Sequence, residues 1–391
     1  MANTRKTILT LHRWLGLGSG LVVFIVSITG CLYAFQEEIF DAVHQDVLYV
    51  AQPQQQALPM SVLYEKAQEA LGPEYPITAA ITHKDPVKTW SFEALKEDHE
   101  ALTYFGQHVY FQTAYLNPYT GEVAGVMDSK YEFFELVKYL HWSLWLSTEV
   151  GQPIVGVSTL IFLVMLISGL VLWWPGSKSK KAFKQRFTVK WGAKFKRLNY
   201  DLHNVPGFYI SMISAIVALT GLVMAFRWVL ALVYFMASGG ETAETPPVKL
   251  EAPVVQTAST PLDEVFTSSR SLYPEAATIG LFGAAQDSLV LAYVKVQDDV
   301  YYESHNLLYE RATGKPLTAQ HHEDRNAGEK LLYMNYDIHV GAILGMPGKI
   351  LAFLASLVCS SLPVTGFLIW YGKRGKQKKH PRVAAPARVS A

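Results

Sequence analysis

The chain has 391 residues and a formal net charge of +1, and half of its residues are hydrophobic. Basic runs that alternate with long apolar stretches are typical of loops that fix membrane topology, so we do not expect a nucleic-acid-binding protein. The chain has two cysteines and no C-x-x-C-H motif, which excludes a disulfide framework and covalent attachment of haem.

Four stretches contain no Asp, Glu, Lys or Arg, and each is longer than 20 residues. They are residues 14–35, 150–177, 202–226 and 350–372. At a rise of about 1.5 Å per residue, a helix of this length crosses the hydrocarbon core of a bilayer. We therefore predict four transmembrane helices. The first is too long for a signal peptide and is expected to be retained.

The distribution of Lys and Arg predicts the orientation. Basic residues precede the first span, nine lie in 176–197 and seven follow residue 372, and the last two segments contain no acidic residue. Cytoplasmic loops are enriched in Lys and Arg, so both termini are expected in the cytoplasm. The segments 37–140 and 237–338 then face the periplasm. They and their membrane edges carry nearly all of the acidic residues.

The sequence repeats itself. Segments 11–35 and 202–226 both begin with Leu-His and place a Thr-Gly pair 17 residues after the histidine. The segments that follow His141 and His339 match as well, with Ser-Gly or Thr-Gly starting 27 and 26 residues later. A duplicated two-helix unit predicts an approximate two-fold axis along the membrane normal.

The two periplasmic segments are expected to fold as small α+β domains. Each contains an amphipathic segment (61–71 and 262–272) and a turn between two strands (117–122 and 310–315), and apolar residues alternate along 290–296. The fold class is therefore integral membrane α-helical, with two outer domains. The predicted boundaries are 1–36, 141–176, 201–237 and 339–372 for the spans, 37–140 and 238–338 for the domains, 177–200 for the basic loop and 373–391 for the basic tail.

Four histidines occupy matched repeat positions. His12 and His203 are expected at the cytoplasmic ends of their helices, and His141 and His339 at the periplasmic ends. The two-fold axis pairs His12 with His203 and His141 with His339. One imidazole from each side is what bis-histidine ligation requires, so we predict two non-covalent b-type haems, one near each membrane face. Two histidines without a carboxylate or thiolate form a poor zinc site.

Small residues follow His12 and His203 along one helix face, among them Gly16, Gly30, Gly207 and Gly221. Such a face lets either a porphyrin or another helix approach the backbone closely. Both interpretations stay open on the sequence alone.

The chain resembles the PepSY-associated transmembrane family over almost its whole length. The resemblance is carried by Leu11-His12-Arg13-Trp14-Leu15-Gly16, Asn117-Pro118-Tyr119-Thr120-Gly121-Glu122, His141-Trp142, Leu202-His203 and Asp337-Ile338-His339. It implies PepSY-type periplasmic domains and a ferric-siderophore reductase of the ferrioxamine type in the bacterial inner membrane. It also implies two haems on His12, His141, His203 and His339. The chain has no flavin-domain motif, so a cytoplasmic reductase or a quinol is the expected electron donor.

Two other functions remain open. The repeats are compatible with a siderophore or peptide transporter without redox activity, although no charged residue lies in the middle of any span. A membrane regulator whose outer domains bind a protease is the third hypothesis. The expected partners of the reductase are a ferric siderophore, the electron donor and membrane lipid.

Overall fold

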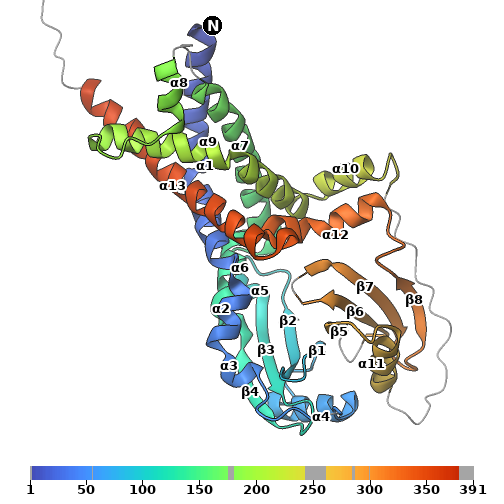
Figure 1. Ribbon diagram of the computed structural model, residues 1–391. Coiled ribbons are helices and arrows are strands. Elements are labelled where there is room, and N and C mark those ends of the chain that lie inside the picture. The colour runs from blue at the N-terminus through green and yellow to red at the C-terminus, as the bar shows by residue number, and fades with distance from the viewer. Residues whose placement is uncertain are drawn as a thin grey trace, which may run out of the picture.

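The computed structural model describes residues 2–54, 56–174, 180–242, 261–283, 287–298 and 300–377. Figure 1 shows a bundle of long helices at one end and a β-sheet with its own helices at the other. Most of the predicted basic tail (373–391) and the start of the predicted basic loop lie outside the described residues.

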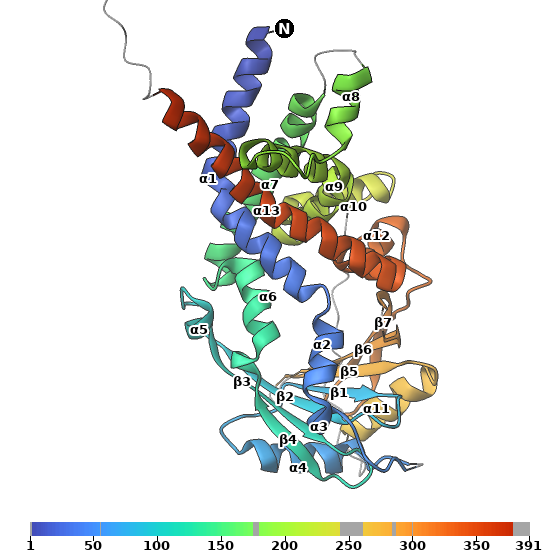
Figure 2. The ribbon, with the colours of Figure 1, turned by 60° about the vertical axis from the view of Figure 1, so that its left-hand side comes forward.

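Four helices are long and apolar enough to cross a membrane, as predicted. They are α1 (Ala2–Tyr33), α7 (Thr148–Trp173), α9 (Phe195–Ala225) and α13 (Gly345–Gln377). α1 and α9 each pack against both α7 and α13, which closes the bundle. The start of α1 and the end of α13 lie at the end of the bundle away from the sheet (Figures 1 and 2).

The predicted starts of the second and fourth spans are wrong, because each matched histidine lies on a separate helix. His141 is on α6 (Phe133–Ser143) and His339 is on α12 (Ala327–Val340). Leu144 and Trp145, with φ of 58° and 60°, interrupt the helical conformation between α6 and α7. Gly341 and Gly345, with φ of 84° and 62°, flank the corner between α12 and α13.

The predicted third span is also interrupted. Phe226 has extended backbone angles and separates α9 from α10 (Arg227–Ala237), a short apolar helix that leaves the bundle sideways (Figure 1). The shorter elements are α2 (Gln36–Val43), α3 (Gln45–Leu48), α5 (Tyr104–Gln107), α8 (Lys180–Phe187), and the 3₁₀ turns η1 (Ser129–Tyr131) and η2 (Ala342–Leu344).

The strands of both outer segments form one antiparallel sheet of eight strands in the order β4-β3-β2-β1-β5-β6-β7-β8. The strands are β1 (Ala79–His83), β2 (Trp90–Glu97), β3 (His108–Leu116), β4 (Val123–Asp128), β5 (Thr278–Phe282), β6 (Leu289–Gln297), β7 (Val300–Glu310) and β8 (Pro316–Gln320). β1 pairs with β5 from Ala79↔Phe282 to His83↔Thr278. The boundary between the two predicted domains therefore runs through the middle of a continuous sheet.

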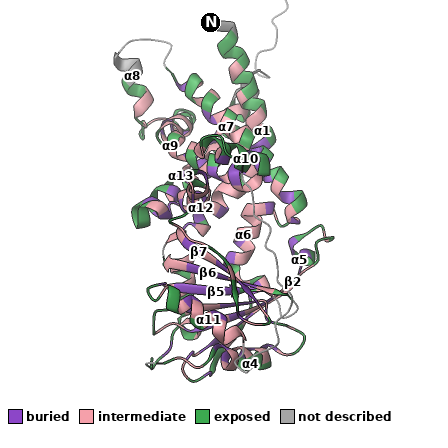
Figure 3. Ribbon diagram, turned by 90° about the vertical axis from the view of Figure 1, so that its right-hand side faces the viewer, coloured by how far each residue is buried: buried purple, intermediate pink, exposed green. Residues whose placement is uncertain are grey.

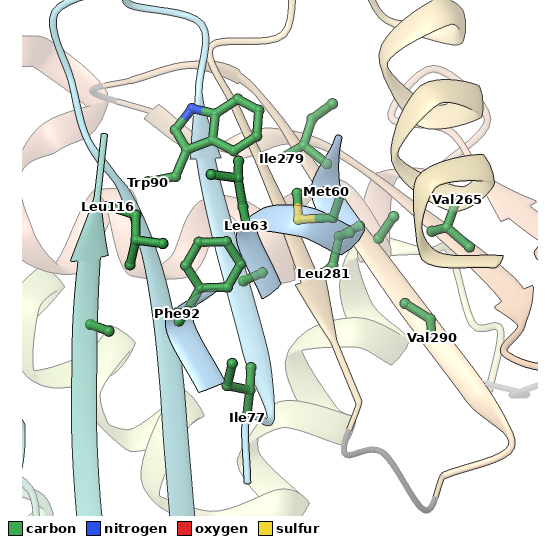
Figure 4. Close-up of a cluster of buried hydrophobic side chains, with 14 of the residues drawn as sticks. Met60, Leu63, Ile77, Trp90, Phe92, Leu116, Val265, Ile279, Leu281 and Val290 are labelled. Atoms are coloured by element: carbon green, nitrogen blue, oxygen red, sulfur yellow. The ribbon is translucent and has the colours of Figure 1, made fainter. Parts of the chain in front are cut away.

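Helices α4 (Met60–Leu71) and α11 (Pro261–Leu272) cover one face of this sheet, as the two amphipathic segments predicted. Figure 4 shows their side chains meeting those of the central strands in the outer core. The alternation on β6 is confirmed, because Val290, Ala292 and Val294 are fully buried there. Figure 3 shows this buried layer along the central strands.

Polar contacts connect the other side of the sheet to the bundle. Asp337 on α12 is fully buried and accepts hydrogen bonds from the backbone N–H groups of Tyr301 and Tyr302 at the start of β7. Lys349 on α13 lies 3.1 Å from Glu37 and 2.9 Å from Glu38 on α2. The Asp337 contacts fix β7 relative to α12, which carries His339, and the Lys349 contacts tie α2 to α13.

Candidate functional site

Each matched histidine contacts a Ser-Gly or Thr-Gly pair on a neighbouring helix. The Nδ1 atom lies at hydrogen-bond distance from the hydroxyl of that pair. The contacts are His12 with Ser168 at 2.8 Å, His203 with Thr365 at 2.9 Å, His141 with Thr29 at 3.2 Å and His339 with Thr220 at 3.0 Å. The same local arrangement therefore occurs four times in the bundle.

The hydrogen-bond partners determine which ring nitrogen carries the proton. His141 Nδ1 lies 2.9 Å from the carbonyl oxygen of Val26, and His339 Nδ1 lies 3.0 Å from that of Val217. A carbonyl oxygen only accepts, so Nδ1–H is the donor in both. Near His12 and His203, the Ser168 and Thr365 hydroxyls donate to carbonyls of their own helices and thus accept from Nδ1. Nε2 therefore keeps its lone pair in all four rings.

The glycine of each pair makes room for the imidazole ring. A Cβ atom at Gly30 would lie 3.3 Å from His141 Cε1, and one at Gly221 would lie 3.2 Å from His339 Cε1. At the other end of the bundle, a Cβ at Gly366 would lie 3.3 Å from His203 Cε1, whereas one at Gly169 would lie 3.5 Å from His12 Cε1, an ordinary contact distance. We call each Ser/Thr-Gly pair a histidine seat.

The structure brings the histidines together in the predicted pairs. The ring centres of His12 and His203 are 6.5 Å apart with an interplanar angle of 89°. Those of His141 and His339 are 6.1 Å apart at 72°. The first pair lies towards the chain termini and the second lies towards the sheet, so we call them the termini-side pair and the sheet-side pair.

These separations fit one metal ion held between two imidazoles. An imidazole nitrogen binds a metal at about 2.0–2.1 Å, and the ring centre lies about 1.1 Å behind it. Two coaxial imidazoles on one ion then have ring centres about 6.2–6.4 Å apart. The two observed values bracket this range. Among the described residues, no group of three or more His, Cys, Asp or Glu side chains is arranged to hold a metal ion.

The two pairs lie at different depths in the bundle. His12 and the Thr29 seat are 17 residues apart on α1, as are His203 and the Thr220 seat on α9. At 1.5 Å per residue this is about 26 Å along each helix. The two pairs are therefore separated by most of the thickness of a bilayer.

A cavity of about 290 Å³ lies beside the sheet-side pair and is lined by residues of all four long helices. Its lining is mainly apolar and includes His141, His339 and their two glycines. Lys138 on α6 is the one Lys or Arg among its lining residues. Ligand pockets of this kind are typically apolar with a few polar groups that orient the ligand.

The cavity is also lined by a cysteine. Cys359 lines it beside the sheet-side pair and lies 3.1 Å from the hydroxyl of Ser214. Cys31 is buried on α1, and both thiols are free.

The sequence interpretation missed the seats, although their four dipeptides are part of the repeat. It also missed the role of two asparagines, each four residues before a histidine. Asn199 donates to the carbonyl of Thr365 at 3.0 Å, and Asn335 donates to that of Thr220 at 3.1 Å. Both are buried and fix the seat that receives the histidine of their own helix. The shared Asn-x-x-x-His spacing was the available signal.

The small-residue faces have two roles. Gly30 and Gly221 contact histidine rings, whereas Gly16 contacts Met165 and Gly207 contacts Leu362 on adjacent helices. At both ends of each face the glycines therefore meet side chains of neighbouring helices, and the predicted approach of a porphyrin stays a prediction. Plain helix packing explains the end with Gly16 and Gly207.

Fold and site together define an integral membrane protein whose spanning helices hold two histidine pairs at different depths. The chain belongs to the PepSY-associated TM region family, whose model matches residues 9–373. No curated protein matches the chain.

Proposed function

We propose that this protein is a transmembrane electron carrier that reduces a periplasmic ferric siderophore. It would hold one b-type haem in the termini-side pair and one in the sheet-side pair. The observation that carries the proposal is the repeated pair geometry, with ring centres 6.5 Å and 6.1 Å apart. Each Nδ1 is engaged by a seat, so each ring presents Nε2 as its metal-binding nitrogen.

When bound, haem would supply one-electron chemistry between Fe(III) and Fe(II). The side chains of the chain hold and orient it. The paired histidines would hold it through their Nε2 atoms, and the seats would hold the ring orientation and raise the basicity of the imidazoles. The mainly apolar lining of the cavity beside the sheet-side pair would limit the access of water.

The proposed direction is from the termini side to the sheet side. The basic segments favour termini in the cytoplasm, in our proposal that of a bacterium, where a reductase or a quinol would deliver electrons. Both histidines of each pair would be engaged in holding the haem, so the chelate would accept its electron without a bond to the protein-bound iron. One electron converts the Fe(III) chelate to Fe(II), a softer ion that hard oxygen ligands hold less tightly.

The approximate two-fold arrangement supports an origin of the chain by duplication of a span–domain–span unit. Each half supplies one histidine to each pair and seats for two of the four rings. Each pair is thus completed only when the two halves pack together.

The test is an absorption spectrum of the purified full chain, oxidised and dithionite-reduced, with haem counted as the pyridine haemochrome. We expect two b-type haems per chain, and one in His12→Ala or His339→Ala. His99→Ala is the matched control, because His99 is exposed on the outer domain. Ferrioxamine added to the reduced protein should reoxidise it with formation of Fe(II).

A colourless protein after haem-replete expression would refute the proposal. Uptake of intact chelate into vesicles would then favour the transporter. Capture of a protease by a redox-inactive chain would favour the regulator.

A further inference from the structure

Arg325 is a buried cation next to the sheet. It lies in the loop between β8 and α12, and it is 3% exposed. Its guanidinium lies over the ring of Tyr333, 3.3 Å from the ring centre, and Nη1 donates to the carbonyl oxygen of Tyr302 at 3.2 Å. Among the described residues, none accepts a hydrogen bond from Nε or Nη2. These two groups form one edge of the guanidinium.

The positive charge of Arg325 also lacks an ion pair within the described part of the chain. The nearby carboxylate of Glu329 is engaged elsewhere, since it accepts from Gln320 and from the backbone N–H of Asn326. Burying an unpaired charge is costly, so buried arginines are normally paired with an anion. Burial accordingly lowers the pKa of Arg325.

A second unpartnered group lies in the same layer. The hydroxyl of Ser304 on β7 is fully buried and has no hydrogen-bond partner among the described residues. Tyr293 on β6 is next to both groups. Burial raises the pKa of Tyr293, while the neighbouring Ser304 hydroxyl and the Arg325 charge lower it. Ser304 is two residues after Tyr302 on β7, and Arg325 donates to the carbonyl oxygen of Tyr302, so both groups lie at this part of β7.

We propose that this layer binds a small oxyanion, a carboxylate or phosphate group, through the Nε and Nη2 edge of Arg325 with Ser304 beside it. The guanidinium edge presents two parallel N–H groups, which match two oxygens of a carboxylate or phosphate. Water would satisfy the hydrogen bonds but would not compensate the charge. The anion ties the sheet to α12, whose opposite end carries His339.

The experiment measures inorganic phosphate bound to the purified full chain by equilibrium dialysis, with sodium chloride of equal ionic strength as the reference. Formate serves as the carboxylate competitor. We expect one phosphate or formate per chain in excess of the chloride reference, and none in Arg325→Met. Arg325→Lys keeps the positive charge but lacks the two parallel N–H groups of the guanidinium. We expect it to bind phosphate or formate at least about tenfold more weakly.

Arg270→Met is the matched control. Arg270 on α11 also lies over an aromatic ring, that of Phe266, but it donates to the carbonyl of Ala276. It should leave anion binding unchanged. A phosphate group that copurifies is found as phosphorus in the denatured protein, and a copurifying carboxylate is found by ion chromatography of the released solutes. Extraction into chloroform–methanol separates a lipid headgroup from free phosphate.

Absence of both bound and copurified oxyanion in the wild-type chain would overturn the proposal. So would equal binding by wild type and Arg325→Met. Neither measurement needs haem, so failure here is separate from failure of the proposed electron transfer.

Discussion

The glycine of a histidine seat offers the sharpest test of the site. Gly221→Ala would place Cβ 3.2 Å from Cε1 of His339. Carbon atoms rest at about 3.5–4.0 Å, so the ring must retreat by about 0.5 Å. Side chains that bind a ligand must stay within about 0.5 Å of their productive positions, so a displacement of this size reaches that limit. Gly221→Val adds two methyl groups and exceeds it.

We therefore expect Gly221→Ala to weaken haem binding at the sheet-side pair by about 10–100-fold, the usual effect of changing the support of a metal ligand. Gly221→Val should lose that haem and retain the termini-side one. The assay is the haem count per chain together with the reduced-minus-oxidised spectrum. Gly18→Val is the matched control, because a Cβ at Gly18 meets nothing within 4 Å.

Two haems with an unchanged spectrum in Gly221→Val would show that the ring does not depend on the seat. Loss of one haem in Gly18→Val as well would point to a general intolerance of helix glycines to substitution. Either result would refute the reasoning from the close approach.

Three further substitutions and one spectrum test other parts of the structure. Asn335→Ala removes the support of the Thr220 seat and should lower haem occupancy of the sheet-side pair, by haemochrome count. Asn204→Ala should not, because half-buried Asn204 donates to the carbonyl of Tyr200 on its own helix. Burial raises the pKa of Glu93 to about 7, so its carboxyl destabilises the fold increasingly as pH rises from about 4.5 to 7. Glu93→Gln should therefore stabilise the protein at pH 8 by at most about 3 kcal/mol and have little effect at pH 4, in denaturant titrations. Asp337→Asn should cost about 1–3 kcal/mol in the same assay, because it weakens the hydrogen bonds to the start of β7. Near-perpendicular imidazoles should give strongly anisotropic low-spin EPR signals, and two rhombic signals typical of parallel rings would contradict the ring geometry.

Much of the architecture was predictable from the sequence because it depends on local composition. The absence of charge over more than 20 residues predicted the four spans, since an unpaired charge in hydrocarbon is costly wherever the helix packs. Alternating apolar residues predicted β6, and amphipathic spacing predicted α4 and α11. The repeat singled out the four histidines before any contact was known.

Only the tertiary structure decided how these parts meet. β1 and β5 pair across about 200 residues of chain, and no local sequence feature of either strand indicates its pairing partner. Leu144 and Trp145 adopt left-handed angles that side chains of their type avoid, so packing of the corner, and not propensity, ends α6. The seats exist only where a hydroxyl and a glycine on one helix meet a ring from another. The sequence determined which residues are present at each repeat position, and the packing of four helices determined the 6.1 Å and 6.5 Å separations on which the proposed chemistry depends.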